Sequence, residues 1–244
     1  FGYAAAKQDD GTYLVEKYTF ADDAEALAAG AIAKYGSTTY INTLADGGSN
    51  DLYLLKDVTE DVVRTSALYL YTNGYKFTGS VDVGSSKGVY IYGDAELSNV
   101  KCKALTLSKQ TSSVIVVKDC TVSGKLTVAS KTDATIEKGS ISNTIEVSGK
   151  LTLKDIKSST GSGGLTVKSG GELVITGGMY KFLTAEKIGS YVANGYVCIE
   201  LPTTDPAYAE GYRYTIGLKD VNVEAETNVA AEAAEAAEAA GKEL

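Results

Sequence analysis

The 244-residue sequence contains no histidine or tryptophan, only two prolines and three cysteines, and arginine at just two positions. Without histidine there is no imidazole base, no Ser–His or Cys–His dyad, and none of the commonest zinc ligand. Two prolines exclude a proline-rich or collagen-like chain. Three scattered cysteines are too few for a disulfide framework or a cysteine metal site. We therefore predict no catalytic centre, metal site or cofactor.

Long hydrophobic runs and net positive charge are also missing. No apolar stretch approaches 18 residues, so no membrane-spanning helix is predicted. The formal net charge of −8 and pI of about 4.7 disfavour nucleic acids, anionic membranes and polyanionic substrates such as pectate. The chain begins at Phe1 rather than Met, as expected of a processed mature protein or an excised piece.

What the sequence does have is an internal repeat. Four segments align without gaps: "YIYGDAELSN" (90–99), "IVVKDCTVSG" (115–124), "ATIEKGSISN" (134–143) and "LVITGGMYKF" (173–182). Each carries apolar residues two apart, followed by a small residue. A second column of apolar pairs recurs about every 20 residues, which is typical of a solenoid. That second column consists of Val81/Val83, Leu105/Leu107, Leu126/Val128, Ile145/Val147 and Leu165/Val167.

These patterns predict an all-β fold, a right-handed parallel β-helix with coils of about 20 residues. Period-2 alternation makes each segment a short strand with one buried face. Successive coils pair in parallel, and their inward side chains form one continuous core. The right hand follows from the general preference of parallel crossovers. We expect the apolar pairs from Leu105 to Val167 to point inward, and Thr106, Thr127 and Thr166 to point outward.

The chain divides into four predicted regions. Residues 1–50 hold a strand near positions 13–16 and a capping helix that stops at Gly36, with Leu27, Ile32 and Tyr35 on one face. Residues 51–182 form the coils, and residues 183–220 form a C-terminal α/β cap. Residues 221–244, "VNVEAETNVAAEAAEAAEAAGKEL", are rich in Ala and Glu and predict a helical tail. The tail suits a solvated spacer or a helix that docks on a neighbouring molecule.

Three segments in this order resemble a known family. They are "ADDAEALAAGAIAKYG" followed by "LYLLKDVTEDVV", then "LYLYTNGYKFTG", and finally "GGMYKFLTAEKIGSYVANGYVCIEL" with "YRYTIG". Together they are similar to repetitive cell-surface proteins of Gram-positive gut bacteria that carry a pectate-lyase-like β-helix. The resemblance covers roughly residues 12–218. It implies secretion and surface display, and it implies no catalytic residues.

An enzyme remains an alternative because polysaccharide lyases and hydrolases also use β-helices. Such lyases need an Arg or Lys base beside Ca²⁺-binding acids, and hydrolases need paired carboxylates. Arg64 and Arg213 lie near opposite ends of the sequence. Asp94 and Asp119 share an aligned corner position that Lys138 occupies next. Two acids and a base favour solvated corner charges over a catalytic cluster.

The candidate ligand-contact surface is a group of three tyrosines, Tyr69, Tyr71 and Tyr75, which could stack on the apolar face of a sugar. The alternative is that they simply cover the first coils, since aromatic residues favour strands. Tyr90 and Tyr92 align with Ile115 and Val117, which predicts that they are buried.

The cysteines leave two alternatives open. Cys120 occupies a small inward position, which predicts a buried thiol. A disulfide between Cys102 and Cys120 is the other alternative for a secreted protein.

The sequence thus predicts a secreted or surface-displayed, non-catalytic structural or adhesive module, located outside the cell or on its surface. Its expected partner is a host or cell-wall glycan or protein. One alternative is an extracellular protein that binds or degrades polysaccharide. Another is a subunit of a self-assembling filament or layer, joined through the caps or the tail.

Overall fold

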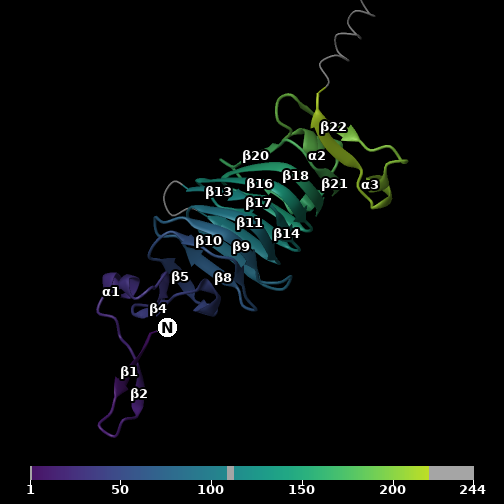
Figure 1. The fold of residues 1–244 in the computed structure, drawn as a ribbon. Coiled ribbons are helices and arrows are strands. Elements are labelled where there is room, and N and C mark those ends of the chain that lie inside the picture. Colours follow the sequence, from purple (N-terminus) through teal and green to yellow (C-terminus); the bar gives the residue numbers. More distant parts are fainter. Residues whose placement is uncertain (1, 109–112, 220–244) are drawn as a thin grey trace, which may run out of the picture.

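A computed structural model describes residues 2–108 and 113–219. It consists mainly of strands arranged in stacked parallel coils of about 19 residues, so the predicted β-solenoid is confirmed. The coils form one elongated body with smaller elements at each end (Figure 1). The right-handed winding and the capping roles of the end segments stay predictions.

One wall of the solenoid, here called the first sheet, has nine strands. Its strands from β5 to β19 pair in parallel, whereas β3 and β4 run antiparallel at the N-terminal edge. In spatial order the first sheet consists of β19 (Leu165–Val167), β17 (Thr144–Val147), β15 (Lys125–Val128), β12 (Ala104–Ser108), β10 (Gly88–Tyr92), β8 (Leu68–Tyr71), β5 (Asp51–Leu54), β3 (Ala33–Tyr35) and β4 (Thr39–Ile41).

The remaining walls belong to one bent sheet, here called the second sheet. A coil crosses it in two segments: β13 pairs with the first half of β16, and β14 pairs with the second half. Its strands are β22 (Tyr196–Glu200), β23 (Tyr214–Leu218), β21 (Met179–Phe182), β20 (Glu172–Ile175), β18 (Lys150–Gly161), β16 (Thr132–Ile141), β14 (Cys120–Val122), β13 (Ser113–Val117), β11 (Ala95–Cys102), β9 (Phe77–Asp82), β7 (Val62–Val63) and β6 (Val58–Thr59).

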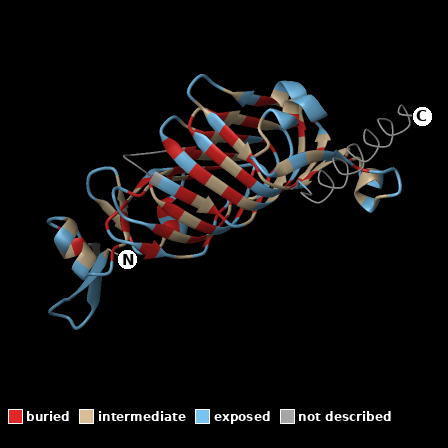
Figure 2. Cartoon of the chain, turned by 90° about the horizontal axis from the view of Figure 1, so that it is seen from above, coloured by how far each residue is buried: buried red, intermediate tan, exposed pale blue. Residues whose placement is uncertain are grey.

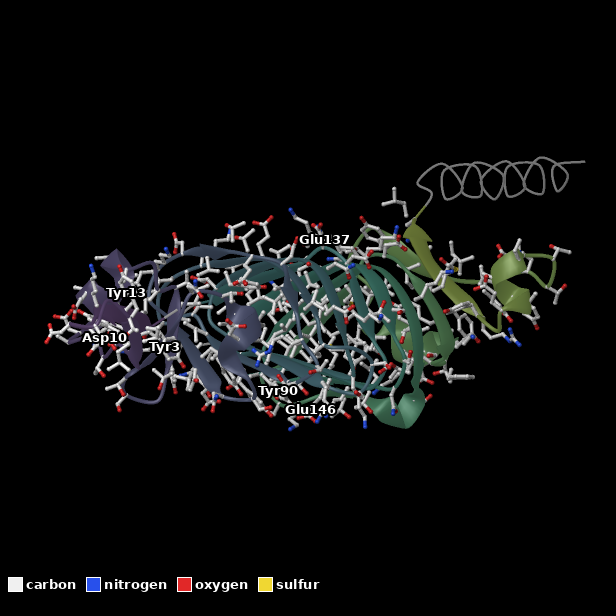
Figure 3. The ribbon with its side chains drawn as sticks, turned by 60° about the horizontal axis from the view of Figure 1, so that its bottom comes forward. Tyr3, Asp10, Tyr13, Tyr90, Glu137 and Glu146 are labelled. Carbon is white, nitrogen blue, oxygen red and sulfur yellow. The ribbon has the colours of Figure 1, made fainter. Side chains whose placement is uncertain are left out.

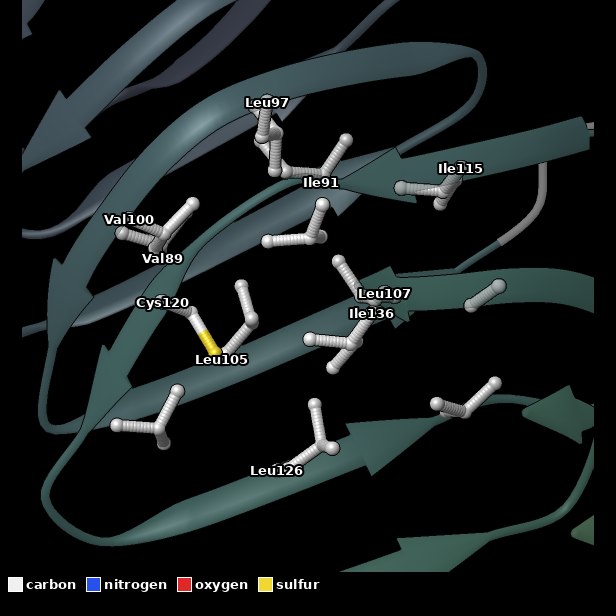
Figure 4. Packing of buried hydrophobic residues seen from close by; sticks show 14 of the residues in the cluster. Val89, Ile91, Leu97, Val100, Leu105, Leu107, Ile115, Cys120, Leu126 and Ile136 are labelled. Carbon is white, nitrogen blue, oxygen red and sulfur yellow. The ribbon is translucent and has the colours of Figure 1, made fainter. Parts of the chain in front are cut away.

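The core is the continuous stack of inward side chains between these walls. Alternate residues along most strands of the coils are buried, which gives the banding in Figure 2. Leucine, isoleucine and valine from successive coils interlock in the interior (Figure 4). The predicted inward residues from Leu105 to Leu165 are all buried, and Val167 is partly buried against the same core. The intervening Thr106, Thr127 and Thr166 lie outside the core, so the predicted register is confirmed.

Two of the predicted alignments are wrong. Tyr90 pairs with Tyr69 on the first sheet, whereas Ile115 pairs with Ala95 on the second. Consequently Val89 and Ile91 are the buried hydrophobic residues of β10, and Tyr90 and Tyr92 face outward. Val81 and Val83 also belong to the second sheet, because Val81 pairs with Val100. The alternation alone could not distinguish the two sheets, because inward residues are two apart in both.

The column of small residues is partly confirmed. Cys120 pairs with Gly139, and an added Cβ at Gly178 would meet the backbone of Ile156, so Gly178 lies in the same column. Ala95 does not belong to it, because Ala95 is paired with Ile115. At Gly139 the backbone has φ of 132°, and an added Cβ would lie 2.1 Å from the Cys120 carbonyl oxygen. Position 139 itself needs glycine, and there β16 continues through the corner as a longer strand than predicted.

The N-terminal region differs in detail from the prediction. Helix α1 (Asp23–Ala28) is shorter than predicted and ends near Gly30, so Tyr35 lies on strand β3 instead. The strand predicted near residues 13–16 is present as β2 (Tyr13–Lys17), and it forms an antiparallel hairpin with β1 (Tyr3–Lys7). The hairpin projects from the end of the solenoid (Figure 1). Strand β3 pairs with β5, so the element next to the first parallel strand of the first sheet is β3 and not helix α1.

The C-terminal region combines short helices and antiparallel strands. Its helix α2 (Ala185–Gly189) buries Ile188, and strand β23 buries Ile216 against the core. The predicted helical tail at 221–244 lies outside the described residues. The remaining short helices are the 3₁₀ turns η1 (Leu44–Gly47) and η2 (Ser162–Gly164) and the α-helix α3 (Pro206–Ala209).

Candidate functional site: two aromatic surfaces

Five tyrosines form two ladders on the outward face of the first sheet, here called the tyrosine ladders. In-register pairing of β8 with β10 places Tyr69 against Tyr90 and Tyr71 against Tyr92. The ring centroids are 4.4 Å apart in the first pair and 4.3 Å apart in the second, and the two rings of each pair are stacked in nearly parallel planes. Tyr53 extends the second ladder, with its centroid 4.7 Å from that of Tyr71. When parallel coils pair in register, side chains of the same kind lie directly above one another, separated by the spacing between strands.

Stacking limits what the tyrosine ladders can bind. The rings of Tyr53, Tyr71 and Tyr92 cover each other's faces, so only the outer faces of the two end rings are free to pack on a ligand. Burial raises the pKa of Tyr71 and Tyr90, and the neighbouring phenol groups add to the shift. Less ring surface of Tyr69 and Tyr71 is therefore accessible to a sugar than the sequence suggests.

Tyr75 does not join the ladders. It lies in the turn after β8 and borders a shallow hollow of the second sheet together with Lys76, Asp94 and Glu96. The structure therefore brings Tyr69 and Tyr71 together and separates Tyr75 from them. Tyr53, Tyr90 and Tyr92 complete the ladders. That they belong to the ladders can be seen only from the register in which the strands of successive coils pair.

The later coils carry a different outward surface on the same sheet. The column through Tyr69 and Tyr90 continues as Thr106, Thr127 and Glu146. Figure 3 shows Tyr90 and Glu146 along one side of the solenoid and Glu137 on the opposite side.

Glu146 is held between two lysines. Its carboxylate pairs with Lys125 at 2.7 Å and also with Lys168. These hydrogen bonds lower the pKa of Glu146 to about 2. Glu96 on the second sheet is paired in the same way with Lys118 and Lys76, which lower its pKa to about 2.

The acids considered for catalysis are dispersed. Asp94 and Asp119 do not share a corner, because Val100 rather than Ala95 pairs with Cys120. Wherever a carboxyl pKa shift is resolved in the described residues, the pKa is lowered. A glycosidase acid needs the opposite shift.

The two arginines lie in different parts of the structure, and each makes contacts with neighbouring residues there. Arg64 is buried at the first coil, where it donates to the Leu44 carbonyl at 3.2 Å. Arg213 packs over the Tyr208 ring in the C-terminal region, 4.0 Å from its centroid. Within residues 2–108 and 113–219, neither arginine forms an ion pair with a carboxylate.

Cys102 and Cys120 are both free thiols in the core. Burial raises the pKa of each to about 12, so neither is a reactive thiolate at neutral pH. In the described part of the chain, no three His, Cys, Asp or Glu side chains converge as metal ligands do. No helix within the described ranges is both long and apolar enough to cross a membrane.

Sequence reasoning missed a second aromatic surface, a cleft of about 260 Å³ at the N-terminal end, here called the N-terminal cleft. It lies between the base of the β1–β2 hairpin and the β3–β4 strand pair. No clear signal in the sequence pointed to it, because the aromatic residues of the lining are scattered over positions 3–40 and come together only through folding. Its aromatic lining consists of Tyr3, Tyr18, Phe20, Tyr35 and Tyr40.

Comparison with protein-family models, with curated proteins and with solved structures gives no significant match to this chain. The fold itself therefore defines the class to which the chain belongs, that of the parallel β-solenoid proteins. Fold alone does not give function, so the proposals below are argued from surfaces.

Proposed function

We propose that the chain is a non-catalytic β-solenoid module displayed outside the cell or on its surface, with a structural or adhesive role. The observation that carries this proposal is the contrast between a uniform core and varied outward surfaces. The inward residues of the coils pack in the core, and the outward residues form tyrosine ladders, threonine columns and Lys–Glu pairs. Such a rigid scaffold suits the presentation of side chains to a partner.

Two further arguments support the proposal. The similarity of three segments to repetitive surface proteins of Gram-positive gut bacteria favours secretion. The electrostatics favour a non-catalytic role, because paired lysines keep Glu96 and Glu146 ionised and neither is prepared to donate a proton. The expected partner is a glycan or a protein of the host or cell wall, and the net charge of −8 disfavours nucleic acid.

Surface labelling of intact cells tests the display. An antibody against the purified chain should label intact source cells as strongly as permeabilised cells. Labelling only after permeabilisation would contradict surface display.

A glycan panel tests the non-catalytic role. The purified protein, incubated with the panel with and without Ca²⁺, should release no oligosaccharide. Reproducible release that is abolished by Asp119→Asn would show that the protein is an enzyme.

Exposed strands at both ends favour a second candidate function, self-assembly of copies end to end. Strand β22 is the last strand of the second sheet, and Val197 and Ile199 on it are exposed. At the other end the β1–β2 hairpin exposes Tyr13 and Val15 and pairs with no other described strand. A two-stranded hairpin is marginally stable in water on its own, and free strand edges accept further strands.

Truncation distinguishes the possible routes of assembly. Light scattering should show oligomers of the full chain and of a 1–220 variant. A 20–244 variant, which lacks the hairpin, should show none. Oligomers that disappear only without residues 221–244 would assign assembly to the tail instead. A monomeric full chain at all concentrations would contradict self-assembly.

A further inference from the structure

Strands β8 and β10 hold four phenol rings in two stacked pairs. Tyr69 and Tyr90 have centroids 4.4 Å apart with 5° between their ring planes, and Tyr71 and Tyr92 have centroids 4.3 Å apart with 7° between theirs. Both pairs are in register across parallel strands, so the two rings of a pair extend from the sheet in the same direction. Tyr53 stacks on Tyr71 more loosely, at 4.7 Å and 17°. The closest phenols are therefore those of β8 and β10.

The hydroxyl ends of each pair are also neighbours. Burial raises the pKa of Tyr90, and the phenol of Tyr69 raises it further. Burial likewise raises the pKa of Tyr71, with further contributions from Asp51 and then from the phenol of Tyr92. Together with the stacking, these effects place the hydroxyl of each ring, and the ring carbons beside it, next to the same groups of its partner.

The position of the Tyr90 ring depends on glycine at position 88. A Cβ added at Gly88 would lie 2.5 Å from the ring carbon Cε2 of Tyr90, so a larger side chain there would displace the ring. The facing sides of the rings are covered within each pair, but all four side chains remain partly exposed. The pairs are thus held in position and still lie within reach of a dissolved oxidant.

The composition leaves tyrosine as the main side chain that a one-electron oxidant can attack. The chain has 17 tyrosines, no tryptophan and one methionine, Met179, which lies on β21 of the second sheet. Cys102 and Cys120 are buried, and burial raises the pKa of each to about 12, so neither is a readily oxidised thiolate at neutral pH. An oxidised phenol of the ladders therefore has few competing electron donors in the chain.

We propose that the two pairs are a site of oxidative cross-linking, at which Tyr69 couples to Tyr90, and Tyr71 to Tyr92, as dityrosine. The co-reactant is a one-electron oxidant, such as a peroxide acting through a peroxidase. The product joins β8 and β10 covalently, so two successive coils are held together by more than their backbone hydrogen bonds.

The reaction removes two electrons and two protons per cross-link. Each phenol gives up one electron and its O–H proton and becomes a phenoxyl radical. The two radicals form a carbon–carbon bond between ring carbons next to the hydroxyl-bearing carbons, and the hydrogen on each coupled carbon then moves to the phenol oxygen. Hydrogen peroxide accepts the two electrons and two protons and leaves as two molecules of water.

Proximity favours coupling within a pair over coupling between copies. Two radicals held in contact react without first having to meet by diffusion, which is equivalent to a very high effective concentration. Tyr3 and Tyr13 on the β1–β2 hairpin are much more exposed, at 68% and 64%, and are the phenols best placed to join one copy to another.

This inference goes beyond the proposed display and adhesion. The cross-link forms or fails on the purified chain wherever the module is located, so failure of either proposal leaves the other standing.

Oxidation of the purified full chain at low concentration tests the site. The oxidants are hydrogen peroxide with a plant peroxidase and, in a second reaction, a light-activated ruthenium complex with persulfate, which is small enough to reach partly buried phenols. Trypsin cuts after lysine and arginine, which places the β8 tyrosines in peptide 65–76 and the β10 tyrosines in peptide 88–101. Mass spectrometry should find these two peptides joined with the loss of two hydrogen atoms per cross-link, and the product should show dityrosine fluorescence.

Phenylalanine variants identify the phenols involved. The double variant Tyr69→Phe with Tyr71→Phe keeps the rings and removes both β8 hydroxyls of the pairs, so it should lose the joined peptides. The matched control is Tyr75→Phe, because Tyr75 lies in the same peptide but outside the ladders, and it should leave the yield unchanged. Circular dichroism checks the folding of each variant.

Three results would overturn the assignment. The first is no joined peptide with either oxidant, although free N-acetyltyrosine couples in the same reactions. The second is a joined peptide that the double variant retains. The third is seen when isotope-labelled and unlabelled chains are mixed before oxidation: joined peptides that combine the two kinds of chain would show coupling between copies instead of within one.

Discussion

The first sheet has two halves that share one inward face and differ on the outward face. In strands β8 and β10 the outward residues are tyrosines stacked on one another, and in β12 to β19 they are mainly threonines with a Lys–Glu–Lys group. The inward residues are leucine, isoleucine or valine in both halves. The fold therefore constrains one face of each strand and leaves the other free to acquire a surface role.

The largest effect should come from the inward face. Leu126 is fully buried, so Leu126→Ala should lower the free energy of unfolding by about 2–5 kcal/mol. The neighbouring outward change Thr127→Ala should cost within about 0.5 kcal/mol. Urea denaturation followed by circular dichroism measures both. Equal costs for the two variants would break the distinction between the inward and outward faces.

The corner of the second sheet should be the next most sensitive position. Gly139→Ala places a methyl group against the Cys120 carbonyl and strains a backbone with positive φ, so it should cost more than about 1 kcal/mol. Gly163 has open space around it, and Gly163→Ala serves as the control. Urea denaturation of the two variants provides the comparison. A neutral Gly139→Ala variant would show that the corner can move.

Loss of a ladder tyrosine should have an intermediate effect. Tyr71 stacks on both Tyr53 and Tyr92, and each aromatic pair contributes roughly 0.5–1.5 kcal/mol, so Tyr71→Ala should cost about 1–3 kcal/mol. Tyr75→Ala, outside the ladder, should have a smaller effect. A double-mutant cycle between Tyr71 and Tyr92 isolates the stacking, and a coupling energy near zero would show that the ladder is not stabilising.

The smallest effect is expected in the later half. Glu146→Gln removes two exposed ion pairs, which are worth at most about 1 kcal/mol each at neutral pH. Since the folded-state pKa of Glu146 is lowered from 4.5 to about 2, its contribution is present above pH 4.5 and is lost as the pH falls toward 2. Stability curves of both proteins should converge over that window. A difference that persists below pH 2 would have another cause.

The sequence predicted the core better than the surfaces. Alternation with a recurrent spacing placed residues such as Leu126 and Ile145 inward, because period-2 alternation follows from strand geometry alone. It placed Tyr90 in the wrong wall, because coils vary in length and pairing depends on how each corner closes. It also grouped Tyr75 with Tyr71, since four residues of sequence separation do not show that the turn after β8 carries Tyr75 onto another wall.

The sequence by itself thus determined the class of fold, the inward residues of the coils from Leu105 to Leu165 and the absence of histidine chemistry. Those features depend on local alternation, repeat spacing and residue type, none of which requires knowledge of the partner strand. Only the tertiary structure decided that Tyr69 and Tyr71 stack on Tyr90 and Tyr92, and that Tyr3 and Tyr40 line the same cleft. These contacts join residues about 20 or more positions apart, and their register is set by corner geometry and by the packing of the core that all coils share.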